Sequence, residues 1–520
     1  MISHSSFLDR LRSRIDRWNM LLTPGRLLGC AAGSAVLFML CYLLFCNDIY
    51  RDVAACYTYY AGEWSRGNWL SAPISALPPL TIFAAGLLAR TGLEIYSAVI
   101  LLSALFYILM IFPLYGLLLR FFPARIAAWG TVLYVLTPKI IRHSGMGLLE
   151  SGRDFFLVLA LYLLFRFLDD RRRRLLPLLC GASLGFLSLT RGEGGVVGLL
   201  LLILLPVLVW RAEHYRPRAL LARALPFFLL AALGMGAVLS PRLIEMYRVT
   251  GYPVTDSRMI SVLQKLPFVP QLFEDKREAL FPRPENPAPL PKLEHEATLK
   301  RLVSSFRGLS RGAYELYFLF ALAGLILVIH RRQWHMEYTV FALIFVCWLA
   351  VFYGIVSAYR YYSFAVPLLM VFTLTALCEL LRLAEKVRLR ELVLAALVVI
   401  FLLQISNGLD ILFRRHELHE LAGWIKAGYP RLFPEHDRRR PVIHTYETPE
   451  LLYYLNGVRR FDYSSPEESP ATLSGCDFIM LRAKYRDLAE EFRRRSDLEE
   501  VSHPFQNRVS IFIPVRRNTR

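Results

Sequence analysis

Residues 95–119 read IYSAVILLSALFYILMIFPLYGLLL, a run of 25 residues without a charged side chain. A helix of about 20 apolar residues is long enough to cross the roughly 30 Å hydrocarbon core of a bilayer. The stretch 27–46 is also uncharged, and 220–239 carries one charge, Arg223. Because backbone polar groups find no water inside a bilayer, these blocks are predicted to be membrane-crossing helices.

The same pattern recurs along much of the 520-residue chain, which is 55% hydrophobic with a mean hydropathy of +0.40. Soluble helices carry apolar residues as a stripe on one face, whereas here they form continuous blocks. We therefore predict an all-α polytopic membrane protein with about eleven transmembrane helices. The predicted spans lie near 27–46, 95–119, 124–137, 155–169, 175–190, 195–210, 220–240, 313–329, 337–356, 364–381 and 391–408.

The net charge of +19 comes from 61 Lys and Arg residues against 42 Asp and Glu residues. Many of the arginines sit in short loops between apolar blocks, which is typical of cytoplasmic loops in membrane proteins. We therefore expect no nucleic-acid partner and place the N-terminal segment 1–26 in the cytoplasm. The other basic loops predicted to be cytoplasmic are 120–125, 171–174, 211–223, 330–332 and 382–390.

The remaining connections are predicted to be extracytoplasmic. Within a transmembrane domain of residues 27–408, they are a first loop (47–94), a second loop (138–154) and a long loop (241–312). The apolar stretch 78–88 is too short to cross and is predicted to be an interfacial or re-entrant helix.

The C-terminal segment 409–520 has no apolar block and is predicted to be a small extracytoplasmic α/β domain. Its alternating apolar patterns are typical of strands at 441–446, 477–481 and 509–515. Helices are predicted at 449–455 and 485–495.

Ionisable residues cluster at three places on the predicted extracytoplasmic side, and charges at a membrane boundary are usually functional or paired. Because these loops should meet at one membrane face, carboxylates and arginines are brought together. Arginine suits a phosphate group and a carboxylate can act as a base, so the pattern favours a phosphate-bearing lipid substrate. The clusters are Asp48, Arg51 and Asp52; Lys139, Arg142, His143, Glu150, Arg153 and Asp154; and Tyr359, Arg360, Tyr361 and Tyr362.

The first loop also carries a family resemblance. Asp52, then Gly67-Asn68-Trp69, then Pro78-Pro79-Leu80 resemble the first-loop pattern of GT-C glycosyltransferases. These enzymes include the protein O-mannosyltransferases and the lipid A aminoarabinose transferases.

Later segments extend the resemblance over about residues 27–370. Residues 137–154 resemble the family's second loop, and Leu189–Gly194 (LTRGEG) resembles its Leu-Thr-Arg-Pro-Glu-Gly stretch. Tyr359-Arg360-Tyr361 followed by Pro367 resembles a late-loop Arg-Tyr motif. Two positions depart from the family pattern. Val53 stands where a Glu is common, and Ala76-Leu77 stand where a Lys or His often precedes Pro-Pro.

The resemblance implies a reaction and roles for residues. The donor would be a sugar on a polyprenyl phosphate, and an acceptor hydroxyl or amine would attack its anomeric carbon with inversion. Asp52 would act as the base, while Arg360, Arg153 or a divalent metal (Mg²⁺ or Mn²⁺) held by Asp52 and Asp154 would stabilise the leaving phosphate. Arg360 or Arg51 would take the place of the family's lysine. The further residues predicted to bind substrate are Tyr361, Glu150 and Asp48.

The acceptor stays open between a glycolipid, a cell-envelope glycan and a protein, and membrane lipid is an expected partner. The main alternative is a transporter or flippase of lipid-linked saccharides. Transporters place charges near the bilayer midplane and often have repeated halves. Here the charges gather at one face and the halves look dissimilar, which favours an enzyme. The Arg-rich N-terminus suits a bacterial inner membrane, with a cytoplasmic N-terminus and a periplasmic C-terminal domain.

Overall fold

The structure, a computed structural model, falls into two units. Residues 1–43 and 61–410 form the helical unit, and residues 44–60 and 411–520 form the second unit. The residues that the structure describes are 22–46, 50, 52–67, 79–170, 172–212, 224–250, 254–255, 303, 307–311, 315–352, 359–413, 420–425, 442–446, 458–459, 478–482, 486–496, 498–503 and 509–514.

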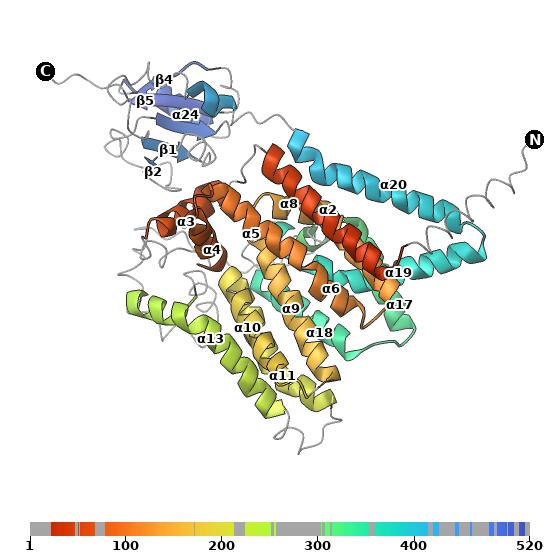
Figure 1. Ribbon diagram of the computed structural model, residues 1–520. Helices are drawn as coiled ribbons and strands as arrows, with labels where there is room; N and C mark the ends of the chain where they lie inside the picture. Colours follow the sequence, from red (N-terminus) through yellow and green to blue (C-terminus); the bar gives the residue numbers. More distant parts are fainter. Residues whose placement is uncertain are drawn as a thin grey trace, which may run out of the picture. The chain divides into compact units, whose positions relative to one another are not determined.

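The helical unit is a bundle of apolar helices (Figure 1). Each of the eleven predicted spans coincides with a helix, except that two consecutive helices share the second span. The helices are α2 (Pro24–Phe45), α4 (Pro79–Ala89), α5 (Ile95–Leu109), α6 (Ile111–Leu118), α7 (Ala124–Val135), α8 (Pro138–Gly145), α9 (Glu150–Asp169), α10 (Leu175–Thr190), α11 (Gly192–Ala212), α13 (Leu225–Thr250), α17 (Glu315–His330), α18 (Met336–Phe352), α19 (Ala365–Lys386) and α20 (Arg390–Leu409), with the 3₁₀ turn η4 at Tyr359–Tyr362.

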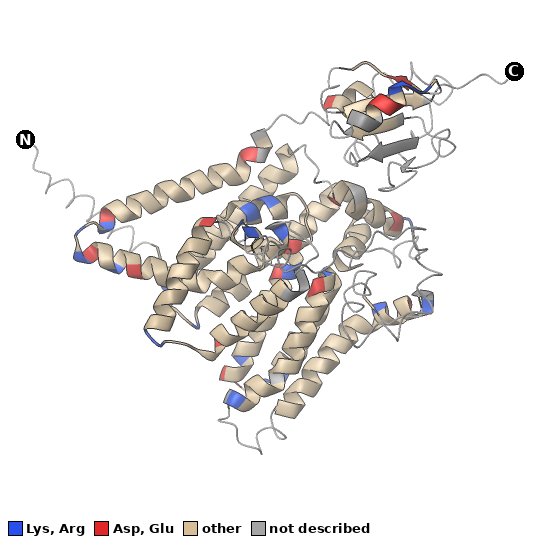
Figure 2. Ribbon diagram, turned by 180° about the vertical axis from the view of Figure 1, so that it is seen from behind, with Lys and Arg blue, Asp and Glu red and all other residues tan. Residues whose placement is uncertain are grey.

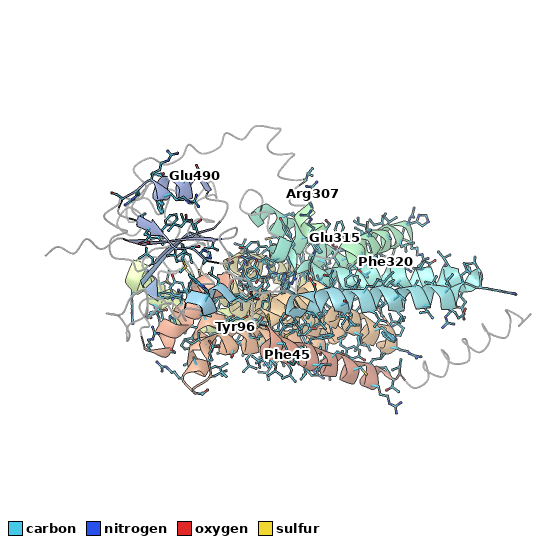
Figure 3. The ribbon with its side chains drawn as sticks, turned by 90° about the horizontal axis from the view of Figure 1, so that it is seen from above. Phe45, Tyr96, Arg307, Glu315, Phe320 and Glu490 are labelled. Atoms are coloured by element: carbon cyan, nitrogen blue, oxygen red, sulfur yellow. The ribbon has the colours of Figure 1, made fainter. Side chains whose placement is uncertain are left out.

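Six of these helical segments are long and apolar enough to cross a membrane. Their outward faces are apolar as well: Leu402 and Leu403 on α20 are 61% and 65% exposed. Figure 3 shows side chains standing out along the helices, Phe320 of α17 among them. A water-soluble protein would bury such side chains, so the chain is a multi-pass membrane protein.

Two of the apolar segments differ from a single continuous membrane crossing. Helix α4 has 11 residues and is therefore about 16 Å long, which is too short to cross, as predicted for 78–88. The predicted span 95–119 is not one regular helix, because α5 ends at Leu109 and α6 begins at Ile111. The cause is Pro113, which lacks a backbone N–H and whose ring clashes with the carbonyl four residues earlier.

Helices α10 and α13 pack closely because each contributes a glycine to their contact. A Cβ atom at Gly181 would lie 1.8 Å from the carbonyl oxygen of Ala231, and one at Gly234 would lie 2.1 Å from that of Leu178. Small residues at such contacts let membrane helices approach backbone to backbone. The pair therefore acts as a rigid support beside α9, on which α10 also packs.

Changing Gly181 to alanine is expected to destabilise the protein, because the added methyl group would overlap the backbone of α13. Overpacking of this kind typically costs about 1–3 kcal/mol. The melting temperature in detergent should fall accordingly. Gly236→Ala on α13 is the matched control, since a Cβ there meets nothing within 4 Å. Equal melting temperatures for the two variants would contradict the close packing.

The second unit contains a small sheet, which confirms the predicted α/β fold. Its order is β2-β1-β3-β5-β4, with β1 parallel to β2 and β3, and β5 antiparallel to β3 and β4. Helix α24 (Arg486–Arg493) follows β3, and Phe492 packs with Leu481 and Phe512 in the core. The predicted helix at 449–455 lies outside the described residues. The strands are β1 (Val442–Tyr446), β2 (Val458–Arg459), β3 (Phe478–Arg482), β4 (Leu498–Glu500) and β5 (Val509–Pro514).

Candidate active site

The second predicted loop is largely helical. Helix α8 occupies Pro138–Gly145, and after a short turn α9 begins at Glu150, five residues before the predicted span. Gly147 makes the turn possible: its φ is +73°, and a Cβ would lie 2.9 Å from Val99. The acids Glu150 and Asp154 therefore lie on the first turns of a helix. The predicted span started at residue 155, after these charges, whereas the helix starts at Glu150 and the charges are buried.

Arg153 and Asp154 form a fully buried ion pair that reaches across the bundle to Ser363. The Arg153 Nε donates to Asp154 Oδ1 at 2.8 Å, and its Nη2 donates to Ser363 Oγ at 2.7 Å. Ser363 in turn donates to Asp154 Oδ2 at 2.8 Å. This closed triangle ties α9 to the residue that follows η4.

The rest of the Arg153 guanidinium is also engaged. Nη1 donates to the carbonyl oxygen of Tyr361 at 2.9 Å, and the ring centroids of Trp348 and Phe364 lie 5.2 and 5.8 Å from its central carbon. Such contacts hold a planar guanidinium in one orientation. Arg153 therefore fixes the position of η4, which carries Arg360 and Tyr361.

Glu150 is the carboxylate at the centre of a second group of charges. Its side chain is 1% exposed, and its Oε1 lies 3.7 Å from Arg191 Nη1 and 3.8 Å from Arg360 Nε. Among the described residues, neither oxygen of Glu150 accepts a hydrogen bond. Burying a carboxylate is costly unless its oxygens are bonded, so this carboxylate is suited to receive a donor group from a ligand.

Tyr361 lies against both arginines of this group. The central carbon of Arg191 is 4.6 Å from its ring centroid and that of Arg360 is 5.0 Å, and Arg360 Nη2 donates to the Tyr361 hydroxyl at 3.1 Å. The aromatic ring keeps the two cations close to each other. Two buried guanidinium groups side by side are a suitable site for a phosphate.

Arg191 and Glu193 were absent from the predicted site residues, although the motif containing them was recognised. Arg191 lies between α10 and α11 and Glu193 lies in the first turn of α11, and Arg191 Nε donates to Glu193 Oε1 at 2.8 Å. Glu193 also lies 3.8 Å from Arg153 Nη1 and so joins the two groups of charges. The sequence did contain a signal for these two residues. They form a charged pair between two apolar blocks, on the same predicted membrane side as Glu150 and Asp154.

His143 on α8 is buried beside these groups. Burial lowers its pKa to about 4, although the nearby Glu150 carboxylate raises it. The imidazole is therefore neutral at physiological pH and adds no charge. Elsewhere in the chain, Figure 2 shows Lys, Arg, Asp and Glu gathered near helix ends, with long uncharged stretches between them.

Within the predicted first loop, Asp52 belongs to the second unit, whereas Gly67 and α4 belong to the helical unit. Asp52 immediately precedes a π-helical turn, η1 (Val53–Tyr57), and helix α3 (Thr58–Ser65) follows. Single π-helical turns are rare and often occur at functional sites. Asp48 and Arg51 lie outside the described residues. Gly67, the first residue of the Gly67-Asn68-Trp69 motif, has a φ of +89°.

The described residues contain no group of three His, Cys, Asp or Glu side chains that could hold a metal ion. At Asp154, Arg153 already supplies a positive charge and Ser363 donates a hydrogen bond. A divalent cation there would have to displace Arg153, so the surroundings of Asp154 do not fit a metal.

The chain was compared with protein families, curated proteins and solved structures. Residues 77–244 match the family described as dolichyl-phosphate-mannose-protein mannosyltransferase. A search of curated proteins finds no significant match. Apo ArnT from Cupriavidus metallidurans has a similar structure, with a TM-score of 0.57, 14% identity and coverage of 93% of this chain and 97% of ArnT. The chain therefore has the fold of ArnT, and residues 77–244 resemble the mannosyltransferase family.

Two further solved structures are similar to this chain. ArnT from the same organism bound to undecaprenyl phosphate aligns with a TM-score of 0.55 and 13% identity, over 93% of this chain and 97% of that one. The apo oligosaccharyltransferase of Archaeoglobus fulgidus aligns with a TM-score of 0.49 and 12% identity, over 88% and 71% of the two chains. The two ArnT alignments confirm the expected GT-C-like fold.

Proposed function

We propose that this glycosyltransferase moves a sugar from a polyprenyl-phosphate donor to an extracytoplasmic acceptor. The observation that carries the proposal is the buried pair of Arg191 and Arg360 around Glu150 within a GT-C fold. Two guanidinium groups match a lipid phosphate, and a carboxylate with open lone pairs matches a sugar or acceptor hydroxyl. The similarity to ArnT, which binds undecaprenyl phosphate, agrees with this donor class.

The reaction is a displacement at the anomeric carbon. The acceptor oxygen or nitrogen forms a bond to that carbon as the bond to the phosphate oxygen breaks, and the electron pair leaves with the lipid phosphate. Asp52 takes the proton of the acceptor. Attack opposite the leaving group inverts the anomeric centre. General-base catalysis of this kind is commonly worth about 10²–10⁴-fold.

The leaving phosphate gains negative charge as its bond to the sugar breaks, and Arg360 stabilises that charge together with Arg191. Arg153 and Asp154 do not contact the substrate directly. Their contacts with Tyr361 and Ser363 support a role in holding η4, which carries Arg360. Glu150 receives a substrate hydroxyl, and Tyr361 contacts both arginines. Asp48 and Arg51 stay as additional first-loop candidates. None of these steps uses a metal ion. Measuring transfer after addition of EDTA tests whether the predicted divalent cation is needed.

We further propose that the enzyme works at a bacterial inner membrane. The N-terminal segment would be cytoplasmic, and the loops with the candidate site and the C-terminal domain would be periplasmic. The distribution of arginines between loops supports this orientation. The acceptor would then be a periplasmic glycolipid, cell-envelope glycan or protein.

Changing Arg360 to glutamine is expected to lower transfer about 10²–10³-fold, since one charged donor to the leaving phosphate is lost. The assay supplies radiolabelled undecaprenyl-phosphate sugars and a crude envelope acceptor to the purified protein in nanodiscs. Arg173→Gln, which removes an exposed arginine paired with Asp170, is the matched control. Absence of transfer by the wild type from any donor, with lipid-linked saccharide still crossing the membrane, would instead support a flippase.

A further inference from the structure

A cavity of about 430 Å³ lies at the ends of α7, α17, α18 and α19. Three of the predicted cytoplasmic basic loops, 120–125, 330–332 and 382–390, meet around it. The side chains that matter for its chemistry are Arg120, Arg331, Arg382, Glu337, Glu379 and Tyr338.

This cavity is separate from the candidate active site. Helix α9 links the two regions, with Glu150 at its first residue and Asp169 at its last. A rise of 1.5 Å per residue puts these ends about 28 Å apart. Asp169 and Glu337 both bind Arg120, which lines the cavity. The cavity therefore lies at the opposite end of the helices from Glu150.

Two arginines share one acid at this cavity. Arg331 Nη2 lies 2.8 Å from one oxygen of Glu379, and Arg382 Nη2 lies 2.8 Å from the other. Each guanidinium has five N–H donors, so these contacts use only a small part of their capacity. The side chains are 36% and 58% exposed, and an anion can reach both.

The surroundings combine this charge with apolar and aromatic surface. Tyr338 stacks on Phe121 with the ring centroids 5.3 Å apart, and Trp334 is 45% exposed nearby in sequence. Tyrosine and tryptophan favour the boundary between lipid and water. Outward-facing apolar side chains such as Ile329 and Leu383, at 56% and 49% exposure, continue along α17 and α19.

We propose that this cavity binds the headgroup of an anionic phospholipid. The lipid phosphate would lie between Arg331 and Arg382, and the acyl chains would run along the apolar faces of α17 and α19. Basic pockets between membrane helices recognise anionic headgroups in this way, and the volume lies in the usual range for a small-ligand site. A free phosphate would use the arginines alone and gain nothing from the apolar faces. The site does not depend on the proposed transfer reaction.

The test measures lipid binding by native mass spectrometry after delipidation of the full-length protein in detergent. Phosphatidylglycerol is expected to bind well, and both phosphatidylcholine and soluble glycerol phosphate poorly. Arg331→Gln/Arg382→Gln should weaken phosphatidylglycerol binding roughly 30-fold. The control, Arg173→Gln/Arg390→Gln, removes two arginines that also pair with acids but do not line the cavity, and it should change binding less than about twofold.

A third variant separates specific binding from a folding defect. Glu379→Gln removes the acid that competes with the lipid phosphate, so it should strengthen phosphatidylglycerol binding. Equal losses in the two double variants would mean that only general surface charge attracts the lipid and would overturn the proposal. Equal binding of glycerol phosphate and phosphatidylglycerol would overturn it in favour of a free-anion site. Weaker binding by Glu379→Gln would also contradict it.

Discussion

Asp52→Asn is expected to reduce sugar transfer about 100- to 10,000-fold, because asparagine cannot accept the proton of the attacking acceptor. The change is nearly isosteric, so the turn η1 and the helix after it should be retained. Binding of the lipid donor should also persist, since the proposed phosphate contacts come from Arg191 and Arg360. Radiolabel transfer and donor binding, measured on the same preparation, check both parts of the expectation.

Glu63→Gln is the matched control for this change. Glu63 lies on α3, one helix beyond Asp52, and pairs with the exposed Arg66 at 2.7 Å. It should leave transfer within about twofold of the wild type, since exposed ion pairs contribute little. Equal transfer by Asp52→Asn and the wild type would remove Asp52 from the base role. Asp48 and Asp154 would then be the next candidates, through their own asparagine variants.

Arg153→Met is expected to destabilise the protein by about 3–5 kcal/mol and to abolish transfer, because it leaves Asp154 as a buried charge without its partner. Met keeps much of the side-chain length and the apolar contact with Trp348. The lost hydrogen bonds to Tyr361 and Ser363 would free η4, and Arg360 would leave its position. The melting temperature reports the first effect and the transfer assay the second.

A double variant distinguishes loss of stability from loss of positioning. Arg153→Met/Asp154→Leu removes both charges and should recover much of the melting temperature, since an apolar pair of similar volume often replaces a buried ion pair without cost. Transfer should stay low because η4 still lacks its anchor. Arg166→Met, near the other end of α9, controls for the substitution itself. Full recovery of transfer in the double variant would show that Arg153 does not position η4.

The membrane fold could be predicted well from the sequence because its signal is local. An uncharged block of 20 residues has few alternatives to a helix inside a bilayer, so α2, α19 and α20 lie close to the predicted spans. The errors fall where local composition is misleading. Pro113 interrupts an otherwise uniform apolar run. The charged residues at the start of α9 are typical of a loop sequence, although they belong to the helix and are buried.

The candidate site was predictable in composition and not in geometry. The sequence indicated Glu150, Arg153 and Arg360 because charges next to apolar blocks are rare. Their partners depend on contacts between distant segments, as in the bond from Ser363 to Asp154. Arg191 was missed as a site residue for the same reason, since nothing local indicates that its turn faces Glu150. A single sequence carries no information on such pairs.

The separation of Asp154 and Ser363 along the chain has a consequence for biogenesis. The two residues are 209 positions apart, so at typical synthesis rates Ser363 leaves the ribosome about 10 to 40 s after Asp154. During that interval α9 must enter the membrane with an acid and an arginine near its first turn. Because Arg153 and Asp154 are neighbours, they can neutralise each other from the moment of insertion. The adjacent pair can therefore keep both charges neutralised in the membrane until the segment that carries Ser363 is inserted.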